Sequence, residues 1–308
     1  MTRVLVVFLD GVGLGSDDPN VNPLAAAEMP VLTGLLGGAR LLGSAGRVHA
    51  RQASLVPTDA SLGVPGKPQS ASGQAALVTG LNVPELIGRH YGPRPNQPIR
   101  AILEGETLFS RALAGGASVA FANAYPQGYF DAVARGKRLH GAIPHAVQAA
   151  GIRLRTADDL RAGQALSVDL TNAGWRNSMG YTDMPLWTAR EAGQVLGGLA
   201  TAHDLTFFDN WATDMVGHHN DMSEALSLLA DLDQFFAGLL AAVDLADTLI
   251  VITSDHGNLE DTSVRGHTLN PVATVVIGAG QQVVADQINS LTDITPALLA
   301  ELKQGATE

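Results

Sequence analysis

Two apolar runs that each end at an acidic residue constrain the fold of this chain more than any other feature. They read RVLVVFLDG at residues 3–11 and TLIVITSDHG at residues 248–257. A continuous apolar run is typical of a strand that is buried on both faces of a parallel sheet. The sequence therefore predicts that both runs lie in a sheet whose two faces are covered.

Segments with helical periodicity alternate with strand-like runs along much of the chain. We expect helices at 29–38, 72–80, 221–243 and 291–303, a helix followed by a strand at 108–125 and at 188–214, and a last strand at 272–280. Such alternation indicates a mostly parallel sheet with helices on both faces. We predict an α/β fold, a three-layer α/β/α sandwich with a doubly wound sheet and a small inserted lobe.

The inserted lobe is predicted from a less regular middle part of the chain. This part holds clusters rich in Pro, Arg and Tyr, such as GRHYGPRPNQPIR, YPQGYFDAVARGKRLH and GWRNSMGYTDMP. We expect residues 1–85 and 190–308 to form a core, and residues 86–189 to form a lobe over the site. Within the lobe segment, a helix and a strand of the core are expected at about 107–124.

The charge and the cysteine content exclude several kinds of partner and chemistry. The 308-residue chain has 19 Lys and Arg against 30 Asp and Glu, a formal net charge of −11. This balance disfavours binding to nucleic acid, which needs a basic surface. The chain has no cysteine, which excludes disulfides, thiolate metal ligands and a cysteine nucleophile.

The first residues predict a strand and not a targeting segment. MTRVLVVFLDG has one Arg, a short apolar run and no cleavage site of small residues, unlike a signal peptide. We expect no apolar run of the roughly 18 to 20 residues that a membrane helix needs. A cytoplasmic protein without a membrane partner is therefore expected, and the sequence makes no prediction about protein partners.

Acidic residues stand at three predicted strand ends, where open α/β sheets bind their ligands. They are Asp10, Asp214 and Asp255. An aspartate at such a position also caps helices and forms turns, which is the alternative for each residue alone. Three of them, two with histidines close by, favour a shared site.

The histidines have the spacing of metal ligands. His218 follows Asp214 by four residues, so both side chains point the same way on a helical turn. His256 follows Asp255 directly, and His267 returns on a loop. Three carboxylates and three imidazoles suffice for two divalent ions, and mixed nitrogen and oxygen ligands suit Mn²⁺ or Zn²⁺. Two ions roughly 4 Å apart are a common device for in-line displacement at phosphorus.

Such a displacement also needs a nucleophile, and two serines in GVPGKPQSASGQAALVTG compete for this role. Ser70 is expected at the N-cap of a short helix, where free N–H groups and the helix dipole favour a phosphoryl oxygen. Ser72 has almost the same local environment. The alternative is that either serine only caps the helix.

Six short motifs occur in the order found in one group of enzymes. They are FLDGVGLG, PQSASGQ, DMVGHH, SDHGN, GHTLNPV and LTDITPALL. Together they resemble the alkaline phosphatase superfamily, and most closely cofactor-independent phosphoglycerate mutase and phosphopentomutase. The resemblance covers residues 1–80 and 200–308 and implies an alkaline phosphatase-like fold, two metal ions and a phosphoserine intermediate.

The resemblance also assigns individual residues. One ion receives Asp214, His218 and His267, and the other receives Asp10, Asp255, His256 and the serine hydroxyl. In the mutases the nucleophile stands three residues before a glycine that a polar residue follows, which selects Ser70 because Gly73 and Gln74 stand there. Gln74 replaces a histidine of the mutases.

The middle part of the chain differs from the phosphoglycerate mutases. Its insert is much shorter, it has no Arg-Asp pair, and no lysine stands shortly before DMVGHH. Phosphoglycerate is therefore disfavoured as the substrate. A clamp for an anion is expected at Arg89, His90, Arg94 and Arg100, with a second basic group at Arg135, Lys137, Arg138 and His140. The alternative is that these residues form a solvated surface.

The sequence thus predicts a two-metal phosphoryl-transfer enzyme that acts on a small, anionic phosphorylated metabolite, with hydrolysis slightly favoured over mutation. One alternative is a phosphodiesterase, sulfatase or phosphonate hydrolase on the same scaffold. QSASGQ lacks the Pro and Arg of the sulfatase signature, which disfavours that branch. The other alternative is a metal-binding module without catalysis.

Overall fold

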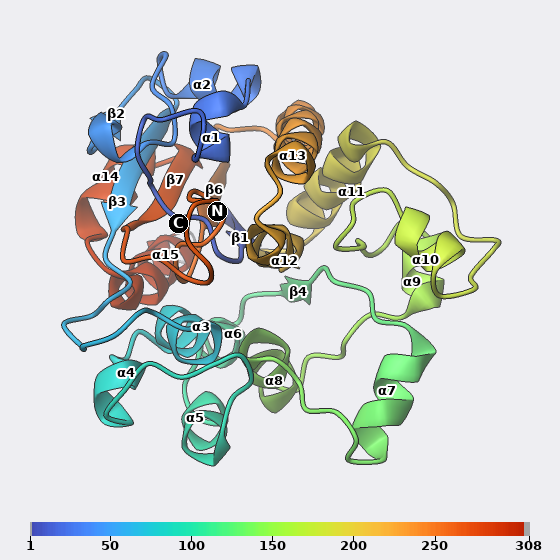
Figure 1. Ribbon diagram of the computed structural model, residues 1–308. Helices are drawn as coiled ribbons and strands as arrows, with labels where there is room; N and C mark the ends of the chain where they lie inside the picture. Colours follow the sequence, from blue (N-terminus) through green and yellow to red (C-terminus); the bar gives the residue numbers. More distant parts are fainter. Residues whose placement is uncertain (1, 305–308) are drawn as a thin grey trace.

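A seven-stranded sheet forms the middle layer of the computed structural model, which describes residues 2–304 (Figure 1). The strands are β1 (Arg3–Leu9), β2 (Val48–His49), β3 (Ala53–Thr58), β4 (Val119–Phe121), β5 (Leu205–Asn210), β6 (Thr248–Thr253) and β7 (Val272–Gly278). Their spatial order is β2-β3-β7-β6-β1-β5-β4. Strands β6, β1, β5 and β4 run parallel, whereas β7, β3 and β2 each pair antiparallel with their neighbours. The predicted α/β sandwich is confirmed, and its sheet is mixed.

Two layers of helices cover the sheet, one on each face (Figure 1). One layer contains α1 (Pro23–Ala26), α2 (Pro30–Leu35), α11 (Ala189–Ala202) and α13 (Met222–Ala242). The other contains α3 (Ser70–Thr79), α5 (Gln97–Leu103), α6 (Leu108–Ala114), α8 (Ala142–Ala149), α14 (Gln281–Gln287) and α15 (Leu291–Gln304). Shorter helices lie between these elements: η1 (Gly43–Ala45), α4 (Val83–Leu86), α7 (Gln127–Ala134), α9 (Ala157–Arg161), α10 (Ala173–Asn177) and α12 (Ala212–His219).

The central strand β1 shows why residues 4–9 are all apolar. Val4, Val6 and Phe8 join the apolar cluster on one face, whereas Leu5 and Val7 join the cluster on the other. Successive side chains of a strand point to opposite faces, and here both faces are covered by helices. Residues 4–9 therefore lose nearly all contact with water on folding.

The antiparallel direction of β7 keeps the β6–β7 connection at one end of the sheet. A parallel neighbour would require a crossover along a face of the sheet. Instead, residues 254–271 return directly, and Gly257 pairs with Thr268 across the loop. Because the loop folds back on itself, residues near its start and its end lie side by side.

Strands β2 and β3 were not expected from the sequence. Pro57 in β3 argues against a strand, because proline cannot donate to a sheet ladder. However, β2 pairs only with Ser54 and Leu55, so at Pro57 the strand β3 has a single neighbour, β7. Proline is tolerated at such an edge position.

Residues 86–189, predicted as a lobe, contribute to all three apolar clusters, and Ala122, Leu166 and Leu170 pack on the face of the sheet that α11 and α13 cover. Helices α5, α6 and α8 and strand β4 belong to the apolar cluster that also contains Val4, Val6 and Phe8 of β1. The helix and strand expected at about 107–124 correspond to α6 and β4. A smaller cluster is formed by Ala124, Ala157, Leu160, Ala165, Trp175 and Met184. The division of the chain into core and lobe stays a prediction.

Helix α13 is long and apolar enough to cross a membrane by length and composition alone, contrary to the expectation from the sequence. Its apolar character has an explanation within the fold. Leu232, Phe235 and Phe236 are buried in the cluster that α11 and α2 also form. Asp233 is buried as well and accepts hydrogen bonds from the backbone N–H groups of Val31 and Leu32, at 3.1 Å and 3.2 Å.

Contact between α11 and α13 depends on glycines at their crossing. A Cβ atom on Gly238 would collide with the backbone carbonyl of Arg190. We therefore predict that Gly238→Ala lowers the free energy of unfolding by about 1–3 kcal/mol, the usual cost of overpacking. Urea denaturation measures this change.

The matched control is Gly198→Ala on α11, where an added Cβ would meet no atom within 4 Å. This substitution is expected to stabilise the protein by about 0.5–1 kcal/mol, since alanine favours a helix over glycine. Equal effects of the two substitutions would contradict the close helix crossing.

Candidate active site

The carboxyl ends of three neighbouring strands carry the acidic residues of the site. Asp10 directly follows β1, Asp209 lies in β5, and Asp255 stands two residues after β6. Because β5, β1 and β6 are parallel neighbours, these ends meet at one edge of the sheet. Asp214 on α12 approaches so closely that a Cβ atom on Gly11, which has φ +71°, would lie 2.7 Å from its Oδ1.

Asp10, Asp255 and His256 form the first group of possible metal ligands. One ligand atom from each residue lies within 4.8 Å of the others, and all three side chains are buried. His256 Nε2 is 3.3 Å from Asp10 Oδ1 and 3.6 Å from Asp255 Oδ2. Ligands bound about 2.1 Å from one ion lie up to about 4 Å apart, so this spacing suits a single cation.

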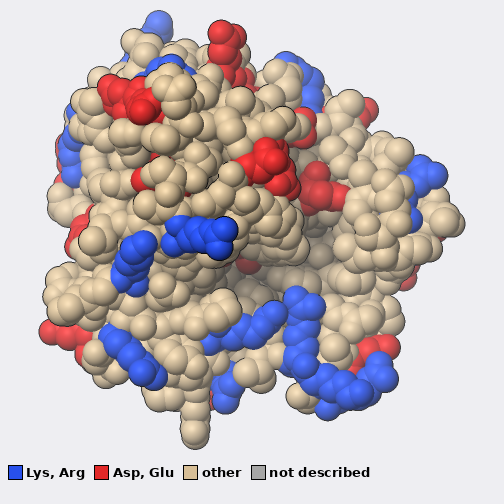
Figure 2. All heavy atoms as spheres, in the orientation of Figure 1, with Lys and Arg blue, Asp and Glu red and all other residues tan. Residues whose placement is uncertain are grey.

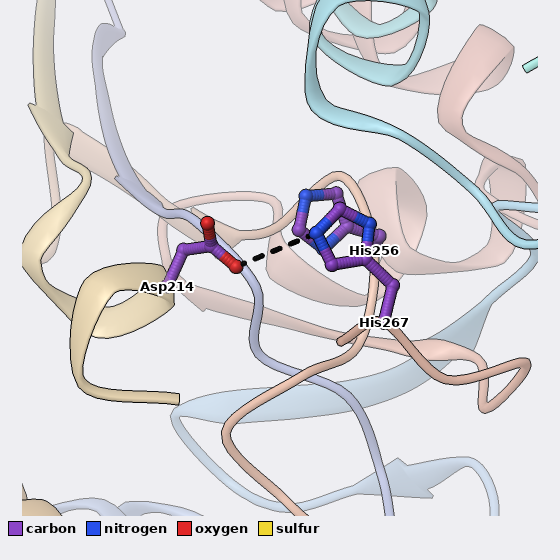
Figure 3. Close-up of side chains that lie close together, drawn as sticks. All are labelled: Asp214, His256 and His267. Atoms are coloured by element: carbon purple, nitrogen blue, oxygen red, sulfur yellow. Dashed lines mark ion pairs between the residues drawn. The ribbon is translucent and has the colours of Figure 1, made fainter. Parts of the chain in front are cut away.

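Asp214, His256 and His267 form a second group that meets the same distance limit (Figure 3). The Asp214 carboxylate points toward the two imidazoles, with Oδ1 3.8 Å from His267 Nε2 (Figure 3). The His256 and His267 rings are stacked, with centroids 3.6 Å apart. Their proximity follows from the folded-back loop between β6 and β7.

A backbone contact orients His267. Its Nδ1 lies 2.7 Å from the carbonyl oxygen of Pro68, which can only accept a hydrogen bond. The proton of a neutral imidazole therefore resides on Nδ1, and the lone pair of Nε2 faces Asp214. This tautomer is the one that a metal-binding Nε2 requires.

His218 stands at the edge of these groups. Its Nε2 is 3.3 Å from Asp214 Oδ2, and its ring centroid is 5.4 Å from that of His267. Its side chain is 47% exposed, whereas His256 is fully buried. The structure thus brings His256, and not His218, into the compact group with Asp214 and His267, and the assignment of ligands to individual ions stays a prediction.

Ser70 is the first residue of α3 and faces the ligand groups. Its Oγ is 3.0 Å from His256 Nε2. One helical turn later, the Gln74 amide donates hydrogen bonds to Asp10 Oδ2 at 3.1 Å and to Asp255 Oδ2 at 3.2 Å. A Cβ atom on Gly73 would lie 3.0 Å from the Asp255 carbonyl oxygen, so glycine permits this close approach of the helix.

Ser72 differs from Ser70 despite its similar sequence environment. Its hydroxyl donates to the carbonyl oxygen of Gln69 at 3.2 Å and accepts from the backbone N–H of Tyr91 at 2.9 Å. The side chain is buried and bonded to the backbone on both sides. Ser72 therefore connects α3 to the following loop, and only Ser70 faces the ligand groups.

Burial and repulsion shift the ionisation of the site. Burial, followed by the charges of Asp255 and Asp214, holds the pKa of Asp10 well above its usual value. Burial raises the pKa of Asp255 to about 7, and burial together with the charge of Asp255 raises the pKa of Asp209 to about 7. Burial lowers the pKa of His256 to about 3. A neutral His256 has the lone pair that metal binding requires.

These side chains fit divalent metal ions. Carboxylate oxygens and imidazole nitrogens together form the mixed ligand set that Mn²⁺ and Zn²⁺ accept. Within the described chain, Asp10 Oδ1 and Asp209 Oδ1 are buried without a hydrogen-bond partner. A buried carboxylate oxygen without a donor is costly, and a cation nearby would compensate it.

Two residues of the site were missed from the sequence. Asp209 occurs in the same run as Asp214, LTFFDNWATD, and has no histidine at ligand spacing. Glu260 is buried and accepts hydrogen bonds from Gly13 N at 3.0 Å, Asn258 N at 2.8 Å and Asn270 Nδ2 at 3.1 Å. It also accepts one from the Thr268 hydroxyl and so connects both ends of the ligand-bearing loop.

A cavity of about 450 Å³ opens next to Ser70. It is bordered by Asp10, Ser70, Gln74, Arg94, Arg138, Asp209, Trp211, Asp214 and His218, among others. Figure 2 shows a hollow on this face, with Lys and Arg gathered along its lower margin, a further basic side chain at its upper left and acidic residues to its upper right. A basic rim beside buried metal ligands suits an anion that bridges the two.

The structure separates the four residues proposed as an anion clamp. Arg94 lines the cavity beside Ser70 and donates to the Leu139 carbonyl oxygen at 2.8 Å. Arg89 and His90 line a different depression together with Lys67. Arg100 contacts the Pro95 carbonyl oxygen at 3.5 Å and does not border the Ser70 cavity. Arg138, from the second basic group, does border it.

The chain is similar in sequence to known proteins over part of its length. A family model described as the Metalloenzyme superfamily matches residues 178–304. The 2,3-bisphosphoglycerate-independent phosphoglycerate mutase of Ruegeria pomeroyi is 33% identical over 128 residues, which is 39% of this chain and 25% of that protein. The corresponding mutase of Desulforudis audaxviator is 27% identical over 125 residues. The chain thus matches only about a quarter of the length of these curated relatives.

Solved structures show the same fold over almost the entire chain. A protein from Pyrococcus horikoshii has a TM-score of 0.61 at 14% identity and covers 98% of both chains. The alkaline phosphatase of the Antarctic bacterium TAB5 has a TM-score of 0.56 at 13% identity and covers 98% of this chain and 99% of that chain. At such low identity the likeness concerns the fold.

The similarity in sequence over residues 178–304 and the likeness in fold over almost the entire chain confirm the resemblance to the alkaline phosphatase superfamily that the motifs predicted. The two curated relatives named above are phosphoglycerate mutases. The TAB5 structure named above is that of an alkaline phosphatase.

The crowded carboxylates lead to a prediction about metal binding. Mn²⁺ or Zn²⁺ is expected to raise the unfolding temperature of the protein, because an ion that binds only the folded state stabilises it. Asp255→Asn is expected to abolish this response. The same substitution should stabilise the metal-free protein by about 1 kcal/mol, because it removes one buried, repelled charge.

Thermal unfolding with and without the ions, after treatment with a chelator, measures both effects. If Asp255→Asn responded to Mn²⁺ and Zn²⁺ as strongly as the unchanged protein, the proposed ligand group would be wrong.

Glu260 leads to a second prediction about the site. Glu260→Ala is expected to weaken Mn²⁺ binding by about 10- to 100-fold, because the loop that carries His256 and His267 loses its internal anchor. Titration calorimetry measures this affinity.

Asp261→Ala is the matched control. The Asp261 carboxylate accepts hydrogen bonds from the backbone and hydroxyl of Ser263, within an exposed turn of the same loop. Its Mn²⁺ affinity should remain unchanged. A similar loss in both variants would indicate a general weakening of the loop.

Proposed function

We propose that this chain is a two-metal phosphoryl-transfer enzyme that forms a phosphoserine at Ser70. The observation that carries the proposal is the position of Ser70 Oγ, 3.0 Å from His256 Nε2 and beside a cavity of about 450 Å³. A nucleophile, metal ligands and room for a small substrate thus meet at one place.

The metal ions belong to the proposal as well. Asp10, Asp255 and His256 would hold one divalent ion, and Asp214, His267 and His218 would hold the other, as Mn²⁺ or Zn²⁺. When bound, such ions supply positive charge that lowers the pKa of a hydroxyl and neutralises phosphoryl oxygens.

The protein groups carry out the remaining steps. Ser70 Oγ attacks phosphorus, the bond from phosphorus to the substrate oxygen breaks, and the alcohol leaves with the proton that the serine gave up. The first turn of α3 places backbone N–H groups and the positive end of the helix dipole near the phosphoryl oxygens. Gln74 fixes the Asp10 and Asp255 carboxylates in position through its amide.

The substrate proposed is a small phosphorylated metabolite. Arg94 and Arg138 border the cavity and can pair with a phosphate or carboxylate of the substrate. We propose hydrolysis slightly ahead of mutation. In its support, the half-exposed side chains of His218 and Trp211 line the cavity, so water reaches its edge.

Ser70→Ala is predicted to lower the turnover of phosphate monoesters by at least about 10³-fold, because the attacking oxygen is lost. The measurement uses a panel of phosphate monoesters with added Mn²⁺ or Zn²⁺. Mass spectrometry of the unchanged protein after incubation with a substrate should show a phosphoryl group on Ser70.

The matched control is Ser72→Ala. Turnover should remain within about tenfold, while the free energy of unfolding falls by about 1–3 kcal/mol because the Tyr91 N–H loses its acceptor. Full turnover of Ser70→Ala would eliminate the proposed nucleophile. Phosphorus NMR distinguishes the two reactions. Hydrolysis releases inorganic phosphate, whereas a mutase reaction forms an isomeric ester.

A further inference from the structure

A second cavity of about 650 Å³ adjoins the cavity of Ser70. The two are contiguous, because Tyr125, Tyr129, Arg138, Trp211 and Met215 border both. Cavities of roughly 300–1,000 Å³ hold small organic ligands. The Ser70 cavity alone is therefore large enough for a small phosphorylated metabolite, and the second cavity offers room for an additional part of the substrate.

Seven of the eighteen residues that line the second cavity are aromatic residues or methionines. The rings of Tyr125 and Tyr129 lie 4.4 Å apart, and Trp175 meets Tyr181 edge to face at 5.1 Å. The indole N–H of Trp175 donates to Ser167 Oγ at 2.9 Å, which holds the ring in place. Fixed rings of this kind bind planar aromatic groups at little entropic cost.

Apolar side chains are exposed at this cavity instead of being buried in the core. Met179 is 47% exposed, Trp211 45% and Met215 44%, and all three line the cavity. A cluster of exposed apolar side chains often marks a binding site. Thioethers also make favourable contacts with aromatic rings.

Three polar side chains in the wall already have hydrogen-bond partners. Asp169 accepts from Ser167 Oγ at 2.6 Å and from Gly174 N at 2.6 Å. Asn123 exchanges two hydrogen bonds with the backbone of Asp209. The Tyr181 hydroxyl accepts from Gln127 N at 3.0 Å. These three groups are less available to a sugar, whereas an aromatic ring needs no hydrogen-bond partner.

We infer that the second cavity binds an aromatic group on the alcohol part of the substrate, so that the enzyme prefers phosphate monoesters of aromatic alcohols. This inference rests on the proposed function, in which Ser70 receives the phosphoryl group. Arg138 lies at the junction of the cavities, with its guanidinium 4.8 Å from the centroid of the Tyr129 ring. An aromatic group entering past this pair would lie between the rings while its phosphate faces Ser70.

The test compares two non-hydrolysable ligands, 3-phenylpropylphosphonate and 3-cyclohexylpropylphosphonate, by titration calorimetry with Mn²⁺ present. They differ only in the ring, which is planar and aromatic in the first compound and saturated in the second. Tighter binding of the phenyl compound by about 3- to 10-fold is expected, the range for one or two aromatic contacts. Equal affinities would overturn the inference, and so would binding of neither compound.

A blocking variant tests the location. Gly128 lines the second cavity but not the Ser70 cavity, and an added Cβ would meet no atom within 4 Å. Gly128→Phe is expected to weaken binding of the phenyl compound by about tenfold or more. Gly34→Phe is the matched control, because Gly34 is also exposed with free space around it and lies on α2, outside both cavities. An unchanged affinity in Gly128→Phe would place the ring elsewhere.

If Gly128→Phe fails to fold, Met179→Glu serves instead, since it puts a charge on the same wall at a half-exposed position. Turnover of 2-phenylethyl and 2-cyclohexylethyl phosphate, whose leaving alcohols are similarly acidic, completes the test. A binding preference without any turnover would contradict only the proposed function. Turnover of both esters at equal kcat/KM, together with equal phosphonate affinities, would contradict only the aromatic preference.

Discussion

Mutual repulsion among buried carboxylates is the constraint on which the site depends. Asp10, Asp209 and Asp255 come together at one end of the sheet, and burial and repulsion raise the pKa of each. Bringing these carboxylates together costs free energy of desolvation and of electrostatic repulsion, and packing contacts do not compensate this cost. The surrounding structure therefore has to be rigid, and an ion that neutralises the carboxylates would relieve the cost. Gln74 is a partial substitute, because one amide donates to two of the three carboxylates.

Rigidity comes from the direction of the strands. The parallel strands β5, β1 and β6 place their three carboxyl ends at one edge of the sheet. The backbone of each strand is fixed by hydrogen bonds to a neighbouring strand on both sides. Antiparallel β7 adds a different advantage. It returns the chain to the same edge without a crossover helix, which is why His256 and His267 stack although eleven positions separate them in sequence. Glu260 then holds the loop closed from inside.

The sequence predicted those parts of the molecule in which a local pattern decides the structure. Buried runs identified β1 and β6, and apolar periodicity identified α13 and α15. The clustering of Asp10, Asp255 and His256 followed from their positions after strands. Contacts between distant segments were not predictable in this way. Asp209 gains its role only from its neighbours in the sheet, and Glu260 only from the backbone N–H groups that converge on it. Neither residue has a spacing that marks it in the sequence.

The lengths of the outer strands have a consequence for association between molecules. The sheet ends in β2 on one side and in β4 on the other, and these strands span only Val48–His49 and Val119–Phe121. A longer free edge would expose a row of unpaired amides and carbonyls on which a second molecule could add a strand and begin to aggregate. The outer strands β2 and β4 are too short for a second molecule to pair with them in this way, and they separate the longer apolar strands from such pairing.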